Sequence, residues 1–221
     1  MTINKKVWFM NNLALIGSKA MAHGIKDMVE LYHLYNVIGY FDDFAEKGSV
    51  VEGKPVLGNT DDCINMYHEG IFDFIFIASG YNSFEGREKL YLKYKGIIPF
   101  ANIISPTAFV HPSARIGEGV LLSDGAYINR DAVIEDNVAI TLRSIVNHGG
   151  HVKKHTFFST GVVTAGNVII GERCFIGVGS VISDGVSICD DVWLTPGSIV
   201  IKDIKKPGHY LSQSSKLFNI G

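Results

Sequence analysis

The chain has 221 residues, of which 47% are hydrophobic, and its 20 Lys and Arg nearly balance its 22 Asp and Glu. Because the charges are well mixed, no basic stripe indicates a nucleic-acid partner and no polybasic segment indicates a membrane surface. Three cysteines without metal-type spacing favour a reducing compartment, and two asparagines interrupt the short apolar run at residues 7–10. We therefore expect a cytoplasmic protein without membrane insertion.

Short apolar runs alternate with helical patterns in the first half of the chain. Strands are predicted at residues 13–16, 37–41 and 72–78, and helices through residue 32, at 60–67 and at 83–94. Residues 53–58 are predicted as a turn-rich connection, and residues 97–104 as a strand or extended linker. This alternation is typical of a three-layer α/β domain, which we assign to residues 1–104, with a second domain at 105–221.

Ligands of such a domain bind at the carboxyl ends of its strands. The predicted strand ends carry Gly17, then Asp42 and Asp43, then Ser79 and Gly80. The first loop lacks the G-x-G-x-x-G run of dinucleotide-binding domains, which argues against NAD. A nucleotide or nucleotide-sugar pocket remains open, with either aspartate accepting hydrogen bonds from base or ribose. The alternative is an ordinary cap between strand and loop.

From residue 110 to residue 200 an apolar residue returns every six positions, without an insertion. Fourteen of these sixteen anchors are Ile, Leu or Val, and the residue four positions after each anchor is small or short-branched. A period of six fits neither a helix nor a hairpin meander, but it fits a β-solenoid with three hexads in each 18-residue coil. A β-sandwich with accidental spacing is the alternative.

The solenoid register separates the histidines of the second domain. His148 lies two residues after an anchor, so its side chain is predicted to point outward at a corner, with Gly166 one coil later. Histidine is suited to proton transfer near neutral pH, and a glycine N–H beside it is suited to an oxyanion. A solvated surface histidine is the alternative. His148, His151 and His155 also suggest zinc, but they lie at different phases of the hexad, which argues against a site within one chain. Zinc ligands assembled across the interface of a trimeric solenoid are the alternative.

Motifs along nearly the whole chain carry a family resemblance. They are Leu15-Ile16-Gly17, His23-Gly24, Gly39-Tyr40-Phe41-Asp42-Asp43, Ile77-Ala78-Ser79-Gly80, His111-Pro112-Ser113-Ala114, Val146-Asn147-His148 and Ala165-Gly166-Asn167-Val168. In these the chain resembles the bacterial nucleotide-linked aminosugar N-acetyltransferases and sialic acid O-acetyltransferases. That family joins a Rossmann-like domain to a left-handed parallel β-helix of hexapeptide repeats.

The resemblance implies a homotrimer with acetyl-CoA between neighbouring β-helices, no required metal, and a nucleotide-linked amino sugar in the N-terminal domain. It makes His148 the general base in a direct transfer and the Gly166 N–H an oxyanion donor. Val178 and Pro196 match positions along the CoA channel. The positions that match the nucleotide-sugar pocket are His23, Gly24, Asp42, Asp43 and Gly80.

The chain departs from the family pattern at two positions. Gly149 replaces the acidic residue that often follows the family histidine, and Phe157 stands where another histidine can occur. Asp131 lies one coil before Gly149, so the spacing predicts that its carboxylate orients His148. A weaker base suffices more readily for an amine than for a hydroxyl, which favours an amino sugar.

Four functions follow from the sequence. The first is N-acetylation of a nucleotide-linked amino-dideoxy sugar, with a 4-amino sugar favoured, for surface polysaccharide or glycan synthesis. The others are O-acetylation of a sialic acid type of sugar, a trimeric zinc lyase of the γ-carbonic-anhydrase type, and a sugar-nucleotide sensor without catalysis. The nucleotide, the sugar and the acylated position stay open.

Overall fold

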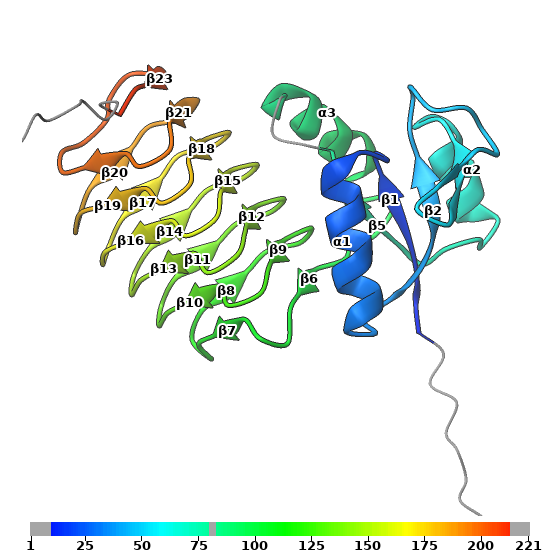
Figure 1. Ribbon diagram of the computed structural model, residues 1–221, viewed down its shortest axis with the longest axis horizontal. Coiled ribbons are helices and arrows are strands. Elements are labelled where there is room, and N and C mark those ends of the chain that lie inside the picture. The colour runs from blue at the N-terminus through cyan, green and yellow to red at the C-terminus, as the bar shows by residue number, and fades with distance from the viewer. Residues whose placement is uncertain (1–9, 80–82, 213–221) are drawn as a thin grey trace, which may run out of the picture. The chain divides into compact units, whose positions relative to one another are not determined.

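The computed structural model describes residues 10–79 and 83–212 and divides the chain into two compact units after Ile103 (Figure 1). Gly80, expected in the nucleotide-sugar pocket, lies outside the described residues. None of the helices in the described part of the chain has the length and hydropathy needed to span a bilayer.

The N-terminal unit is built on one sheet and three helices. Its strands are β1 (Asn12–Ile16), β2 (Asn36–Phe41), β3 (Val50–Val51), β4 (Lys54–Gly58) and β5 (Phe74–Ile77), and its helices are α1 (Ala20–Leu31), α2 (Asp62–His68) and α3 (Phe84–Tyr94). The strand order is β3-β4-β2-β1-β5, with β3 antiparallel to β4 and the other pairs parallel. The predicted α/β fold is confirmed.

Helices cover the sheet because its central strands are apolar on both faces. Ala14 and Ile16 of β1 share a buried cluster with Cys63 of α2 and with Tyr91 and Tyr94 of α3. Leu13 and Leu15 are also fully buried and point to the opposite face by the alternation of a strand. Helix α1 contributes a separate buried stripe of Ala22, Ile25 and Val29.

The segment expected to be a turn-rich connection, residues 53–58, is instead mostly strand. Residues 54–58 form β4, in which Val56 pairs with Tyr40 of β2 and Pro55 with Val50 of β3. Gly53, Pro55 and Gly58 make the segment read locally as a turn. Pairing with β2 on one side and with β3 on the other overrides that local preference.

The second unit is a parallel β-helix with three faces, and its strands stack coil on coil (Figure 1). The six-strand face holds β7 (Phe109–Val110), β10 (Tyr127–Ile128), β13 (Ile145–Val146), β16 (Val163–Thr164), β19 (Val181–Ile182) and β22 (Ile199–Val200). The five-strand face holds β8 (Arg115–Ile116), β11 (Val133–Ile134), β14 (His151–Val152), β17 (Ile169–Ile170) and β20 (Ser187–Ile188). The seven-strand face holds β6 (Ile103–Ile104), β9 (Leu121–Leu122), β12 (Ala139–Ile140), β15 (Phe157–Phe158), β18 (Phe175–Ile176), β21 (Val192–Leu194) and β23 (Gly208–Tyr210).

The hexad pattern explains this fold. Each anchor is the inward residue of a strand, and the anchors from Leu122 to Val200 are buried with the small column that follows them. Each residue three after an anchor, from Gly119 to Gly197, has a positive φ and turns the chain at a corner. The predicted hexapeptide solenoid is confirmed.

Candidate active site

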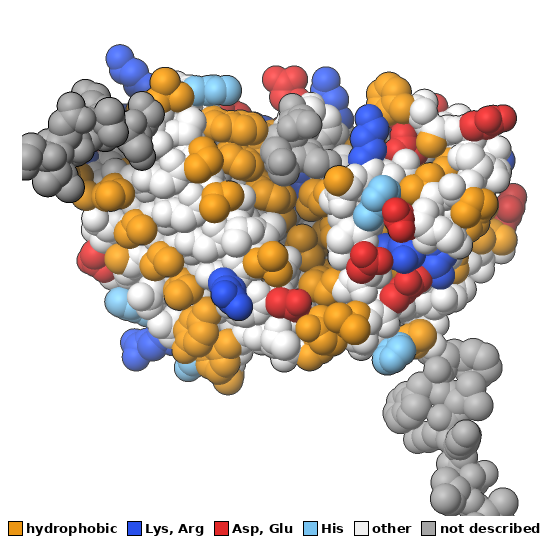
Figure 2. Space-filling view, in the orientation of Figure 1, with side chains coloured by type: hydrophobic (Ala, Val, Ile, Leu, Met, Phe, Trp, Pro, Cys, Tyr) orange, Lys and Arg blue, Asp and Glu red, His pale blue; other side chains and the backbone are white. Residues whose placement is uncertain are grey.

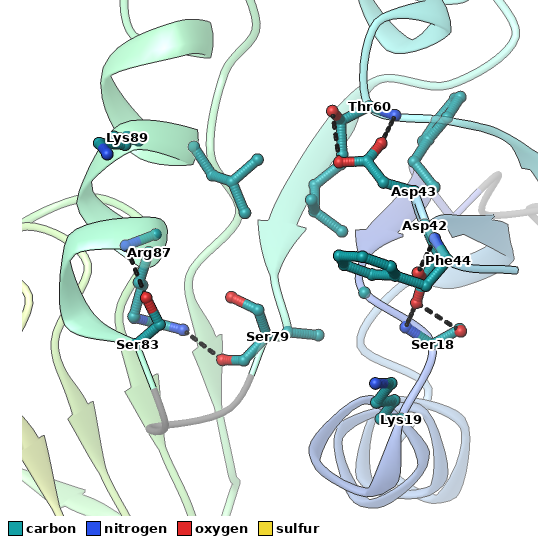
Figure 3. Close-up of a pocket in the computed structure, with 16 residues that line it drawn as sticks. Ser18, Lys19, Asp42, Asp43, Phe44, Thr60, Ser79, Ser83, Arg87 and Lys89 are labelled. Atoms are coloured by element: carbon teal, nitrogen blue, oxygen red, sulfur yellow. Dashed lines mark hydrogen bonds between the residues drawn. The ribbon is translucent and has the colours of Figure 1, made fainter.

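A cavity of about 550 Å³ opens at the carboxyl ends of β1, β2 and β5 (Figure 3). Strand order reverses here, because the chain passes from β1 to β2 on one side and later returns to β5 on the other. Ligands of open α/β sheets bind at such a switch point. The lining residues are Ile16, Gly17, Ser18, Lys19, Phe41, Asp42, Asp43, Phe44, Thr60, Ala78, Ser79, Ser83, Gly86, Arg87, Lys89 and Leu90.

Asp42 ties the first two strand ends together. Its Oδ2 accepts hydrogen bonds from the N–H (2.9 Å) and hydroxyl (2.6 Å) of Ser18, and its Oδ1 accepts one from the Phe44 N–H at 2.9 Å. Burial raises the pKa of the Asp42 carboxyl, but the hydrogen bonds from Ser18 and Phe44 outweigh burial and hold that pKa below its ordinary value. Asp42 therefore shapes the cavity as an anion.

The Asp43 carboxylate accepts hydrogen bonds from Thr60, which lies just before α2. Its Oδ1 accepts from the Thr60 N–H at 2.7 Å and its Oδ2 from the Thr60 hydroxyl at 3.1 Å. Lys93 donates to the same hydroxyl at 3.0 Å. Both aspartates thus have protein donors, and both remain in the cavity wall.

Five other lining residues were not singled out in the sequence: Lys19, Phe44, Ser83, Arg87 and Lys89. The Phe44 ring is 89% exposed, and the Lys19 ammonium lies 5.6 Å from its centroid. Arg87 is buried and donates to the carbonyls of Ile77 (2.7 Å) and Ser79 (3.2 Å), and desolvation lowers its pKa to about 10. The sequence did predict a helix that starts at residue 83 and faces the same sheet edge. That prediction is the feature from which the α3 side of the cavity wall could have been found.

Hydrogen bonds at the corner between β13 and β14 determine the tautomer of His148. Asn147 Oδ1 accepts from the His148 N–H (2.8 Å), the Asn129 side-chain amide (2.7 Å) and His148 Nδ1 (3.2 Å). The backbone N–H must donate, so the atom that faces Nδ1 is the amide oxygen, and Nδ1 carries the proton. In the neutral form of this tautomer Nε2 carries the free electron pair that a general base requires.

Gly166 leaves the space beside Nε2 open. A Cβ on Gly166 would lie 2.5 Å from His148 Nε2 and 2.3 Å from its Cε1, so no other residue fits there without displacing the ring. The N–H groups of Arg130 and His148 are capped by the preceding asparagine side chains. Ala165 precedes Gly166 and has no such acceptor. Among the described residues, nothing accepts a hydrogen bond from the Gly166 N–H.

Both units match known protein families. Residues 12–93 match the PglD N-terminal domain, and residues 104–209 match the GMPPB C-terminal domain. The structure resembles the acetyltransferase domain of PglB from Neisseria gonorrhoeae, with a TM-score of 0.83 and 25% identity over 91% of this chain and 97% of that one. It also resembles PerB from Caulobacter crescentus in complex with CoA and GDP-perosamine, with a TM-score of 0.83 and 29% identity over 91% and 94%.

Two relatives also match part of the chain in sequence. The UDP-3-O-acylglucosamine N-acyltransferase of Albidiferax ferrireducens is 32% identical over 102 residues, which are 44% of this chain and 31% of the relative. That of Bordetella avium is 36% identical over 95 residues, 43% of this chain and 26% of the relative. The chain thus matches less than a third of the length of these relatives. Its two units are thus similar to two different family models, and its fold is similar to that of acetyltransferases of known structure.

The family positions expected along a CoA channel lie at a different corner from His148. Val178 and Pro196 are both exposed, stand one coil apart, and lie where the seven-strand face passes into the six-strand face. His148 and Gly166 lie where the six-strand face passes into the five-strand face. In one chain the six-strand face therefore separates the two groups.

Two expected nucleotide-sugar residues lie outside the cavity wall. His23 donates from Nε2 to the Ser18 carbonyl at 2.8 Å, so it supports the loop that lines the cavity. Gly24 lies in the first half of α1, with no atom of another segment within 4 Å of where its Cβ would be.

Asp131, expected to orient His148, has another partner in the structure. Its Oδ2 lies 3.3 Å from Arg130 Nε, and it occupies a left-handed corner position with φ of 58°. Gly149 has φ of 63°, and a Cβ there would lie 2.4 Å from Asn167 Oδ1. The Asn167 side chain thus occupies the space next to position 149, and Asn147 provides the hydrogen bond to the imidazole.

The three histidines proposed for zinc point to separate partners. His151 Nε2 lies 2.6 Å from Glu135 Oε1, and buried His155 Nδ1 lies 2.9 Å from Asn137 Nδ2. Within the described ranges, no three His, Cys, Asp or Glu side chains come together as a metal site. The described part of a single chain therefore holds no zinc ligand set, and a zinc lyase would need ligands from more than one chain.

Proposed function

We propose that this chain is an acetyl-CoA-dependent N-acetyltransferase that acts on a nucleotide-linked amino-dideoxy sugar, with a 4-amino sugar favoured, for surface polysaccharide or glycan synthesis. The observation that carries the proposal is the corner at which His148 Nε2 is free beside the uncapped Gly166 N–H. The likeness to PerB with CoA and GDP-perosamine, over 91% of this chain, supports both substrate classes. The free cysteines, two of them buried, suit a cytoplasmic setting.

The N-terminal cavity is proposed to hold the nucleotide part of the acceptor sugar. The exposed Phe44 ring at its edge offers a face on which a planar base can stack. Lys19 and Lys89 supply positive charge for phosphates, at the switch point where α1 and α3 begin. Asp42 and Asp43 keep lone pairs for a hydrogen-bond donor of the base or ribose, and His23 supports the same loop through the Ser18 carbonyl. Gly24 stays a proposed position of the pocket from the family resemblance alone.

The chemistry at the solenoid corner is a direct transfer. His148 Nε2 accepts a proton from the acceptor nitrogen as that nitrogen bonds to the thioester carbonyl carbon. The Gly166 N–H donates to the developing oxyanion, and the carbon–sulfur bond then breaks. His148 returns its proton to the leaving thiolate. No metal is needed in this sequence of steps.

A homotrimer would bring the two separated corners together between copies. The first residue of each strand on the six-strand face points outward, and these residues are Phe109, Tyr127, Ile145, Val163, Val181 and Ile199. Figure 2 shows hydrophobic side chains as a diagonal row over the strands of this face. An exposed apolar ladder of this kind favours burial against another copy. Val178 and Pro196 of that copy are then proposed to line the CoA channel next to His148.

The central test of the proposed function is His148→Ala. A screen of thiol release from acetyl-CoA with UDP-, GDP- and dTDP-linked 3-amino and 4-amino sugars should identify an acceptor. His148→Ala should lower kcat for that acceptor at least about 100-fold, since a positioned general base contributes roughly 10²–10⁴-fold. His111→Ala, at a partly exposed histidine of another coil, is the control. Wild-type turnover by His148→Ala would contradict the proposal.

A further inference from the structure

One carboxylate faces the space beside His148 and belongs to none of the steps above. A Cβ on Gly166 would lie 2.7 Å from Asp184 Oδ1 and 2.5 Å from His148 Nε2. Asp184 stands one coil after Gly166, as His148 stands one coil before it. Because glycine lacks a side chain, a base and a carboxylate from coils two apart border the same small space.

Among the described residues, Asp184 differs from the other aspartates of the solenoid in having no protein partner. Asp124, Asp131, Asp136, Asp190, Asp191 and Asp203 each have a hydrogen-bond or ion-pair partner. Within residues 10–79 and 83–212, no donor or cation pairs with the exposed Asp184 carboxylate. Its negative charge is therefore available to a ligand in the space over Gly166.

An amine and a hydroxyl differ in what they require of that space. Amino groups have ordinary pKa values of about 8 to 10 and so are largely cationic near neutral pH. A carboxylate attracts an ammonium group and forms a charge-assisted hydrogen bond with it, whereas a neutral hydroxyl gains much less. We propose that Asp184 binds the ammonium group of the acceptor beside His148, and that it thereby selects amino sugars over hydroxyl sugars. The proposal rests on the proposed acetyl transfer.

The role of Asp184 fits a balanced reaction. The ammonium group, held by Asp184, gives one proton to His148 Nε2 and becomes a neutral amine. Its nitrogen bonds to the thioester carbonyl carbon, the Gly166 N–H donates to the oxyanion that forms, and the carbon–sulfur bond then breaks. The proton on His148 goes to the thiolate, and the remaining extra proton of the amine is released to solvent. Asp184 faces the imidazolium that exists between the two transfers, so its charge also stabilises that state.

A binding measurement in the inactive His148→Ala protein isolates this role from catalysis. Calorimetric titrations compare the amino-sugar nucleotide identified by the thiol-release screen with its counterpart that carries a hydroxyl at the same carbon. Asp184→Asn in this background should weaken the amino sugar roughly 10- to 100-fold, which is the range for a hydrogen bond to a charged group. Binding of the hydroxyl counterpart should change less than about 3-fold. Asp190→Asn, the same change at the same hexad position of the next corner, is the matched control.

Each outcome decides the proposal. Selective weakening of the amino sugar by Asp184→Asn, with Asp190→Asn unchanged, supports it. Unchanged amino-sugar affinity, or equal weakening of both sugars, overturns it. Failure of the proposed acetyl transfer gives a different result. Either His148→Ala alone releases thiol at the wild-type rate, or the screen finds no acceptor.

Discussion

At the residue scale, two hypotheses for what orients His148 make different predictions. The spacing of the coils predicts that Asp131 orients the ring, whereas the hydrogen bond to Nδ1 indicates Asn147. Asn147→Ala removes the acceptor that holds Nδ1 protonated, so we expect kcat to fall about 10-fold with little change in the KM for acetyl-CoA. The pH profile of kcat should change as well, because the tautomer and the basicity of the ring are no longer constrained.

Asp131→Asn is the comparison for this prediction. It leaves the Asn147 hydrogen bond in place, so its kcat should stay within about 2-fold of wild type if Asn147 is the orienting residue. A larger loss in Asp131→Asn than in Asn147→Ala would favour the hypothesis drawn from the spacing. Circular dichroism of both variants checks that the solenoid is folded.

Asp42 makes stability of the N-terminal unit depend on pH. Its folded-state pKa is lowered, so the unfolded chain binds more protons as the pH falls towards 4. The stabilisation is fully present above the ordinary pKa of about 3.9 and is lost as the pH falls through the lower folded-state value. Asp42→Asn should lower the free energy of unfolding by about 1–3 kcal/mol at pH 7, and this difference from wild type should shrink below pH 4.

Urea unfolding followed by circular dichroism at 222 nm suits this measurement, because the helices of the described chain all lie in the N-terminal unit. Ser18→Ala is the control, since it removes the 2.6 Å donor but keeps the carboxylate. Ser18→Ala should lower the free energy of unfolding by less than Asp42→Asn does. A difference for Asp42→Asn that stays constant from pH 7 to pH 3 would show that the carboxylate charge is not the cause.

At the scale of elements, the sequence predicts what repeats and misses what depends on pairing between particular strands. The hexad anchors predicted the solenoid strands because the anchors from Leu122 to Val200 are buried in the same way in successive coils. Strand β4 was missed because its pairing with β2 and β3 overrides a locally turn-like composition. The left-handed corner column, with glycine, asparagine or aspartate at most of its positions, was also present in the sequence and explains the conformation of Gly149.

The candidate site shows the same division. The hexad phase predicted that His148 and Gly166 are neighbours, and the structure places the ring directly against Gly166. It did not predict Asn147, whose role depends on a side-chain rotamer, or Asp184, which meets His148 only across a residue without a side chain. Coil spacing gives neighbours along a column, but not the direction in which each side chain points.

At the scale of the whole molecule, the proposed homotrimer decides whether the site is complete. Val181 is 45% exposed on the six-strand face, and Ile169 is 40% exposed on the five-strand face. Each is the outward first residue of a two-residue strand, so an aspartate at either position is a comparable change within one chain. Val181→Asp places a charge in the proposed interface, where burying it without a partner is costly. Ile169→Asp places the same charge outside it.

Wild type and Ile169→Asp should therefore have about three times the 24.2 kDa mass of one chain by light scattering, whereas Val181→Asp should shift towards that single-chain mass. Thiol release should fall in parallel with the loss of trimer, because Val178 and Pro196 would no longer stand beside the His148 of another copy. A Val181→Asp protein that stays trimeric would rule out the six-strand face as the interface. A monomeric protein with full activity would instead show that His148, Gly166 and a CoA channel lie together within one chain.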